Sequence, residues 1–109
     1  MKRIPDFTVY GNRHISHVPA YLIPPAPKHK GLQLVAHKTL DDTCLGRWTV
    51  AEESTSFFIG RGHTRAAAIE NAIHALAKKT PEQIEFALIF AAQHVANVKN
   101  RLENDHASV

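Results

Sequence analysis

The chain has 109 residues, 44% of them hydrophobic, which fits one domain whose core needs neither disulfide nor metal. The single cysteine, Cys44, excludes an intrachain disulfide, and no apolar run resembles a signal peptide or could span a bilayer, so we expect a cytoplasmic protein. The net charge of +3 is uneven: residues 1–50 carry seven Lys/Arg against three acids, and residues 51–109 carry six against seven. The basic N-terminal half suggests an anionic partner.

Residues 1–31 predict an N-terminal strand followed by a proline-rich basic loop. The first seven residues are expected to fray, and a short strand at 8–10 is expected to pair with 15–18 until Pro19 interrupts it. Three prolines within residues 24–27 then favour extended geometry and exclude a helix. The tip of this loop carries Lys28, His29 and Lys30. It is either a simple connector or a stiff finger that presents these side chains to a phosphate backbone.

Residues 32–61 alternate between apolar and polar side chains, as is typical of a three-stranded antiparallel meander. Trp48 is expected to anchor the core from the middle strand. Gly60 and Gly62 are expected to end the last strand, because glycine tolerates backbone angles that a Cβ atom forbids.

Residues 64–104 predict a layer of two helices. Thr64 is a suitable N-cap for a helix at about 65–79, and the run Thr80-Pro81-Glu82-Gln83 has the pattern of a capping box. The expected fold class is therefore α+β: a single domain, 1–109, with a three- to four-stranded antiparallel β meander followed by two C-terminal α-helices.

The second helix carries more apolar surface than one seam requires. Residues spaced four and three apart form a continuous seam, namely Ile84, Leu88, Ala91, Val95, Val98 and Leu102. Phe86, Ile89 and Phe90 lie off that seam. At 1.5 Å per residue, residues 81–103 span roughly 34 Å and the first helix roughly 22 Å, so the first helix cannot cover the second. We expect a homodimer through these three residues, with complete burial within one chain as the alternative.

The chain lacks a recognisable catalytic constellation. It has no nucleophile–base pair at a known spacing, and none of its histidines has the paired spacing of a zinc site. We therefore expect a non-enzymatic protein without cofactor or metal. The junction at residues 60–65 is either a tight turn or an anion site, since Arg61 and Arg65 flank the free amides of a helix start.

Three short motifs occur in order along the chain: Pro19-Ala20-Tyr21, Ala26-Pro27-Lys28-His29, and the run from Gly60 to Ala68. With them, residues of about 19–77 resemble a double-stranded-RNA-binding domain. The resemblance implies that the loop at His29 enters a minor groove and that Arg65 contacts phosphates across the neighbouring major groove. Ala66 and Ile69 stand where that family has its other two phosphate-binding lysines.

These observations favour a small binding protein that engages nucleic acid or a nucleoprotein. The expected contacts are Lys28, His29, Lys30, Arg61 and Arg65, with Lys38 as a further candidate. The alternative is a protein-interaction adaptor or inhibitor, of the kind that mobile elements encode, which would use the apolar face of the last helix. A third option is a small-molecule pocket between Trp48 and the helices. No membrane partner is expected.

Overall fold

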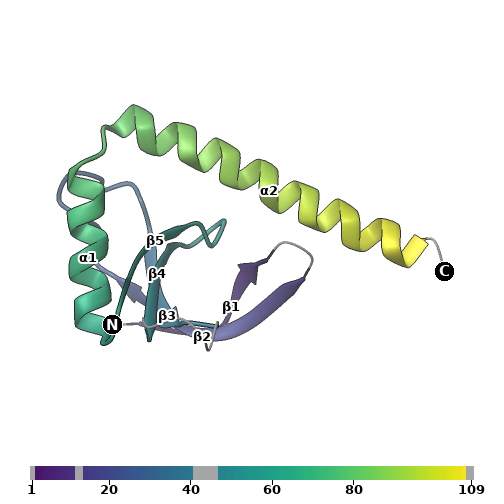
Figure 1. The fold of residues 1–109 in the computed structure, drawn as a ribbon, viewed down its shortest axis with the longest axis horizontal. Coiled ribbons are helices and arrows are strands. Elements are labelled where there is room, and N and C mark those ends of the chain that lie inside the picture. Colours follow the sequence, from purple (N-terminus) through teal and green to yellow (C-terminus); the bar gives the residue numbers. More distant parts are fainter. Residues whose placement is uncertain (1, 12–13, 41–46, 108–109) are drawn as a thin grey trace.

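A computed structural model describes residues 2–11, 14–40 and 47–107, with the backbone alone for 104–107. Five antiparallel strands form one sheet in chain order: β1 (Arg3–Tyr10), β2 (Ile15–Ile23), β3 (Leu34–Lys38), β4 (Trp48–Glu52) and β5 (Phe58–Gly62). Two helices follow, α1 (Arg65–Ala77) and α2 (Pro81–Ala107). Helix α1 packs on one face of the sheet, and α2 begins near the C-terminal end of α1 and runs across above the strands in the view of Figure 1. The α+β class and the two C-terminal helices are confirmed, while the meander has one more strand than expected.

The additional strand length comes from the N-terminal hairpin. Residues 3–7 do not fray, and Pro19 does not interrupt, because β1 and β2 pair from Tyr10↔Ile15 to Arg3↔Tyr21. The register shifts between Ile4 and Phe7, next to Pro19 on the other strand. Pro5 lies inside the same irregularity. Proline has no amide to donate, and a bulge is where a sheet tolerates it, so one irregularity accommodates both prolines.

Strand β3 is buried on both faces, although its sequence predicts a half-buried strand. Leu34 and Ala36 belong to a core cluster beneath α1, whereas Val35 belongs to a second cluster on the opposite face. The second cluster exists because the sheet curls: the ring of Phe7 on β1 lies 5.6 Å from that of His37 on β3, with β2 between the two strands. The curled sheet thus encloses apolar side chains that a flat sheet would expose.

Helix α1 approaches β5 closely because two positions of β5 lack a side chain. A Cβ atom at Gly60 would lie 2.8 Å from the backbone nitrogen of Ala72, and one at Gly62 would lie 2.4 Å from that of Ala68. The strand ends at Gly62, as expected, but it continues through Gly60, and no described glycine has a positive φ. The expected cause, backbone angles that only glycine tolerates, is therefore wrong. Their role is to let the helix backbone contact the strand.

Both predicted helix starts are confirmed. The Thr64 hydroxyl accepts a hydrogen bond from the amide of Ala67 at 3.1 Å. At α2 the Thr80 amide donates to Gln83 Oε1 at 2.9 Å, and the Gln83 amide donates to the Thr80 hydroxyl at 3.2 Å. These reciprocal bonds constitute a capping box.

The apolar seam of α2 faces the rest of the protein. Ile84 and Leu88 pack against the cluster beneath α1, and Val98 is fully buried further along the helix. His94 hydrogen-bonds through Nε2 to the carbonyl oxygen of Gly11 at 3.2 Å, so α2 also contacts the tip of the β1–β2 hairpin. Helix α2 therefore contacts the rest of the protein in two places, the core cluster beneath α1 and the tip of the β1–β2 hairpin.

Candidate functional site

Cationic and aromatic side chains from four separate elements meet where α1 begins. The Arg65 guanidinium carbon lies 4.8 Å from the ring centroid of Tyr21 and 5.8 Å from that of Trp48. Lys38 Nζ lies 5.9 Å from the Trp48 centroid. The two rings are 6.2 Å apart and inclined by 49°. The three distances from a cation to a ring centroid are all within the range of a cation–π interaction. We call these four residues, together with Arg3, the cationic–aromatic cluster.

The sheet register explains why these residues meet. Tyr21 pairs with Arg3 on one side, and Lys38 pairs with Trp48 on the other. Because side chains alternate along a strand, these four side chains lie on the face of the sheet that α1 covers, just beyond the N-terminal end of α1. A cavity of about 330 Å³ opens beside the cluster, and its lining includes Arg3, Tyr21, Lys38 and Trp48. The walls are otherwise largely apolar, with contributions from Val18, Pro19 and Leu40.

The electrostatic surroundings of the cluster are one-sided. The first turn of α1 contains no acidic residue, although acids are favoured at the positive end of a helix dipole. Arg65 occupies that position instead. Among the side chains that the structure describes, the contacts of Lys38 and Arg65 are with the aromatic rings of the cluster.

The basic loop lies at the other end of α1. His29 is only 7% exposed, and its Nε2 is 2.9 Å from the Leu76 carbonyl oxygen and 3.2 Å from that of Lys79. Because carbonyl oxygens can only accept, Nε2 carries the proton. Lys28 Nζ donates to the Ala77 carbonyl at 3.3 Å. Both residues satisfy the C-terminal carbonyls of α1, roughly 18 Å from Arg65 along the helix.

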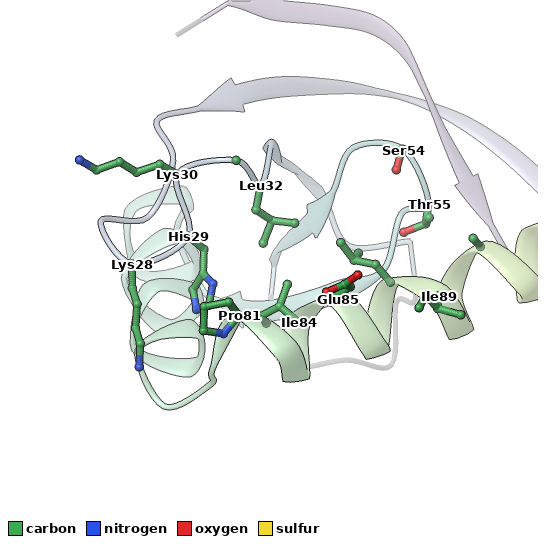
Figure 2. Close-up of a pocket in the computed structure, with 13 residues that line it drawn as sticks. Lys28, His29, Lys30, Leu32, Ser54, Thr55, Pro81, Ile84, Glu85 and Ile89 are labelled. Carbon is green, nitrogen blue, oxygen red and sulfur yellow. The ribbon is translucent and has the colours of Figure 1, made fainter.

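Lys30 is exposed, as Lys28 is, and its side chain points away from the body (Figure 2). The loop, the β4–β5 turn and α2 surround a cavity of about 630 Å³. The His29 ring lies next to Pro81 at the start of α2 (Figure 2), and both residues line this cavity. His29 is therefore buried between the end of α1 and the start of α2, whereas Lys28 and Lys30 are exposed.

Arg61 does not join Arg65. Gly60 and Gly62 direct their missing side chains at α1, so alternation along β5 places Arg61 on the opposite face of the sheet. Its guanidinium carbon lies 4.8 Å from the ring centroid of Phe58. Of the sequence-predicted cations, the fold brings together Arg65 and Lys38, and it separates them from Lys28, His29 and Arg61.

Sequence reasoning missed two members of the cluster and gave a third another role. Arg3 was expected in a frayed segment, Tyr21 carried no predicted contact, and Trp48 was assigned to the core. Trp48 is partly buried and does pack against the cluster beneath α1, but its ring also contacts Lys38 and Arg65. The Lys38–Trp48 pairing depends on the register of the β3–β4 hairpin, which short-range sequence signals do not specify.

The outer face of α2 is apolar and exposed, as predicted. Phe86, Ile89 and Phe90 are 64%, 62% and 63% exposed. At 100° per residue they lie on the side of the helix opposite its seam. The rings of Phe86 and Phe90 contact edge to face, with centroids 4.9 Å apart. The apolar surface continues onto β5, because Phe86 shares a cavity of about 390 Å³ with Phe57 and Phe58.

Two buried polar side chains are satisfied internally. His37 donates from Nδ1 to the Lys38 carbonyl at 2.8 Å, and burial lowers the pKa of its ring despite this hydrogen bond. The Glu52 carboxylate accepts hydrogen bonds from the amides and hydroxyls of Ser54 and Thr55 in the β4–β5 turn. Both groups therefore contribute hydrogen bonds to the fold.

Among the described residues, no group of three or more His, Cys, Asp or Glu is arranged to hold a metal ion. Cys44 lies outside the described residues. None of the helices in the described part of the chain is both long enough and apolar enough to cross a membrane.

Comparison with known proteins adds no relative: no family model, no curated protein and no solved structure matches this chain. The resemblance to a double-stranded-RNA-binding domain therefore stays a prediction. The residues that carry it run from β2 to α1.

Proposed function

We propose that this protein is a small, non-enzymatic nucleic-acid-binding protein whose contact surface is centred on the cationic–aromatic cluster. The observation that carries the proposal is that Lys38 and Arg65 contact the rings of Tyr21 and Trp48, beside a cavity that Arg3 also lines. Cations supply sequence-independent attraction to phosphates, and aromatic rings offer surfaces for bases. Few polyanions other than nucleic acids would engage both the cations and the aromatic rings.

The electrostatics of α1 support the same conclusion. A helix start attracts anions through its free amides and its dipole, and here Arg65 adds a full positive charge. Placing an arginine there costs stability in the isolated protein. An external phosphate would offset that cost.

The test is the salt dependence of binding to a labelled oligonucleotide. Contacts from three cations predict that log affinity falls with log salt at a slope of about −2 to −3. Replacing Lys38 with Gln should weaken binding and reduce the slope by about one. The matched control is Lys78→Gln, which removes the same charge at the other end of α1 and should change neither quantity. Binding that is indifferent to salt, or equally weakened by both substitutions, would contradict the proposal.

A second function, self-association, is favoured by the outer face of α2. Exposed apolar patches of this kind mark interaction surfaces, and aromatic residues dominate the binding energy at such surfaces. We propose that two copies pair through Phe86, Ile89 and Phe90. A two-fold pairing places the same patch on both copies, so no other partner surface is required.

Sedimentation equilibrium of the full chain measures this directly. Phe90→Glu should raise the dimer dissociation constant by at least about 30-fold, the change expected for a hot-spot residue. Ala66→Glu introduces the same charge at an exposed position of α1, away from this patch, and should leave the constant nearly unchanged. A wild-type protein that stays monomeric up to high micromolar concentration would exclude self-association. A heterologous adaptor role would then be the remaining use of the patch.

A further inference from the structure

We infer that the cavity beside the cationic–aromatic cluster accommodates one unpaired nucleobase, which makes single-stranded nucleic acid the preferred ligand. This inference rests on the proposed nucleic-acid-binding function and specifies its ligand. It departs from the duplex that the sequence resemblance implies.

The two aromatic rings of the cluster are open to the cavity. Tyr21 and Trp48 both line it, whereas Arg65, which contacts both rings, is not among the lining residues. The guanidinium group therefore braces the rings from outside the cavity and leaves them available to a ligand inside it. Arg65 is in this respect a positioning residue.

The size and lining of the cavity suit a nucleoside. Its volume of about 330 Å³ lies at the lower end of the range for small-molecule sites, roughly 300–1,000 Å³, which suits one nucleoside rather than a helical groove. The walls combine two aromatic rings with the apolar side chains of Val18, Pro19 and Leu40. The rings are inclined by 49°, so a base stacked on one ring would meet the other ring at the same tilt.

Two cations of the cavity are placed to contact the phosphate of a bound nucleotide. Arg3 and Lys38 line the same cavity from β1 and β3. A base held against the rings would carry its phosphate past these two cations. Bases in an A-form duplex are stacked on one another, so only an unpaired base can enter such a recess.

The test uses a reporter that the chain already provides, because Trp48 is its single tryptophan. The full-length protein is titrated at low salt with four 12-mers: single-stranded oligo(U), single-stranded oligo(dT), an abasic strand of equal phosphate number, and a 12-base-pair duplex. A mononucleotide, UMP, forms a fifth arm. We expect both base-bearing strands to quench Trp48 emission and the abasic strand to leave it unchanged. A difference between oligo(U) and oligo(dT) identifies RNA or DNA as the source of the base, and quenching by UMP alone at similar concentration identifies a free nucleotide.

Two variants separate stacking from charge. Tyr21→Leu keeps the reporter and every cation, and should weaken base-bearing strands by about 5- to 150-fold, with no effect on the abasic strand. Arg65→Lys keeps the charge but loses the planar brace, so it should affect base-bearing strands more than the abasic one. Circular dichroism confirms that each variant is folded before it is titrated.

The outcomes distinguish the inference from the function on which it rests. Equal affinity for the abasic and base-bearing strands, or binding without a change in Trp48 emission, overturns the stacking inference and leaves nucleic-acid binding intact. Preference for the duplex has the same consequence. Failure of all five ligands to bind at low salt overturns both.

Discussion

Replacing Gly62 with Ala is the sharpest test of how the site is built, because this glycine lets α1 contact β5 and so positions Arg65. The new Cβ atom would lie 2.4 Å from the Ala68 nitrogen and 2.7 Å from the Ala67 carbonyl carbon. Both are backbone atoms of the helix, so no side chain can rotate aside. Ordinary contact begins at about 3.4 Å, and the helix must therefore shift by about 1 Å relative to the strand.

The cost is that of overpacking a core that cannot relax locally. One extra methyl group in such a position costs typically 1–3 kcal/mol, and backbone opposition places Gly62→Ala near the upper end. For a domain of this size the loss corresponds to a fall in melting temperature of roughly 4–12 °C. Gly60→Ala, whose Cβ atom would meet Ala72 at 2.8 Å, should be destabilised in the same way but less.

Urea unfolding, followed by circular dichroism and by Trp48 emission, measures the effect. Gly31→Ala is the matched control, since nothing lies within 4 Å of its Cβ position, and its free energy of unfolding should change by no more than about 0.5 kcal/mol. The reasoning is refuted if Gly62→Ala and Gly31→Ala unfold at the same urea concentration.

Three further predictions concern the buried polar groups. His29→Leu should cost about 0.5–1.5 kcal/mol of stability, because it removes the side-chain hydrogen bonds to the Leu76 and Lys79 carbonyls. The folded variant should bind oligonucleotides with wild-type affinity, and weaker binding would show that His29 belongs to the contact surface. The pKa of His37 is lowered by burial, so its ring is neutral in the folded state, and the unfolded state takes up the proton first as pH falls. Stability should therefore decline as pH drops below about 6.5, and this decline should be smaller in His37→Leu when unfolding is measured from pH 8 to pH 5. Glu52→Gln removes one acceptor oxygen from Ser54 and Thr55, and a loss of roughly 1.5–3 kcal/mol in urea unfolding is expected; an unchanged midpoint would show that the β4–β5 turn does not depend on the carboxylate.

Much of the helical half could be predicted because its signals are local. The Thr64 cap and the capping box at Thr80 and Gln83 depend on residues three positions apart, and both occur as expected. The exposure of Phe86 and Phe90 follows from helical periodicity, since a seam on one side of a long helix leaves the other side outward. Whether a second copy covers that side is not a property of periodicity and stays a proposal.

The N-terminal half and the site resisted prediction because both depend on pairings between distant residues. Pro19 was expected to end a strand, but a bulge in the partner strand admits it, and that bulge is invisible from β2 alone. The composition of the basic loop predicted that His29 contacts a ligand. In the structure, His29 is turned inward and bonds to carbonyls that lie almost fifty positions away in the sequence.

The amino-acid order alone determined the class of fold, the helix starts and the apolar character of α2, because caps and periodicity operate over a few residues. Tertiary structure alone decided which cations gather. Arg3, Lys38 and Arg65 become neighbours through strand register and the close seating of α1 on Gly60 and Gly62. Charge in the sequence marks candidates, whereas a binding surface requires convergence in space, and only the folded sheet supplies it.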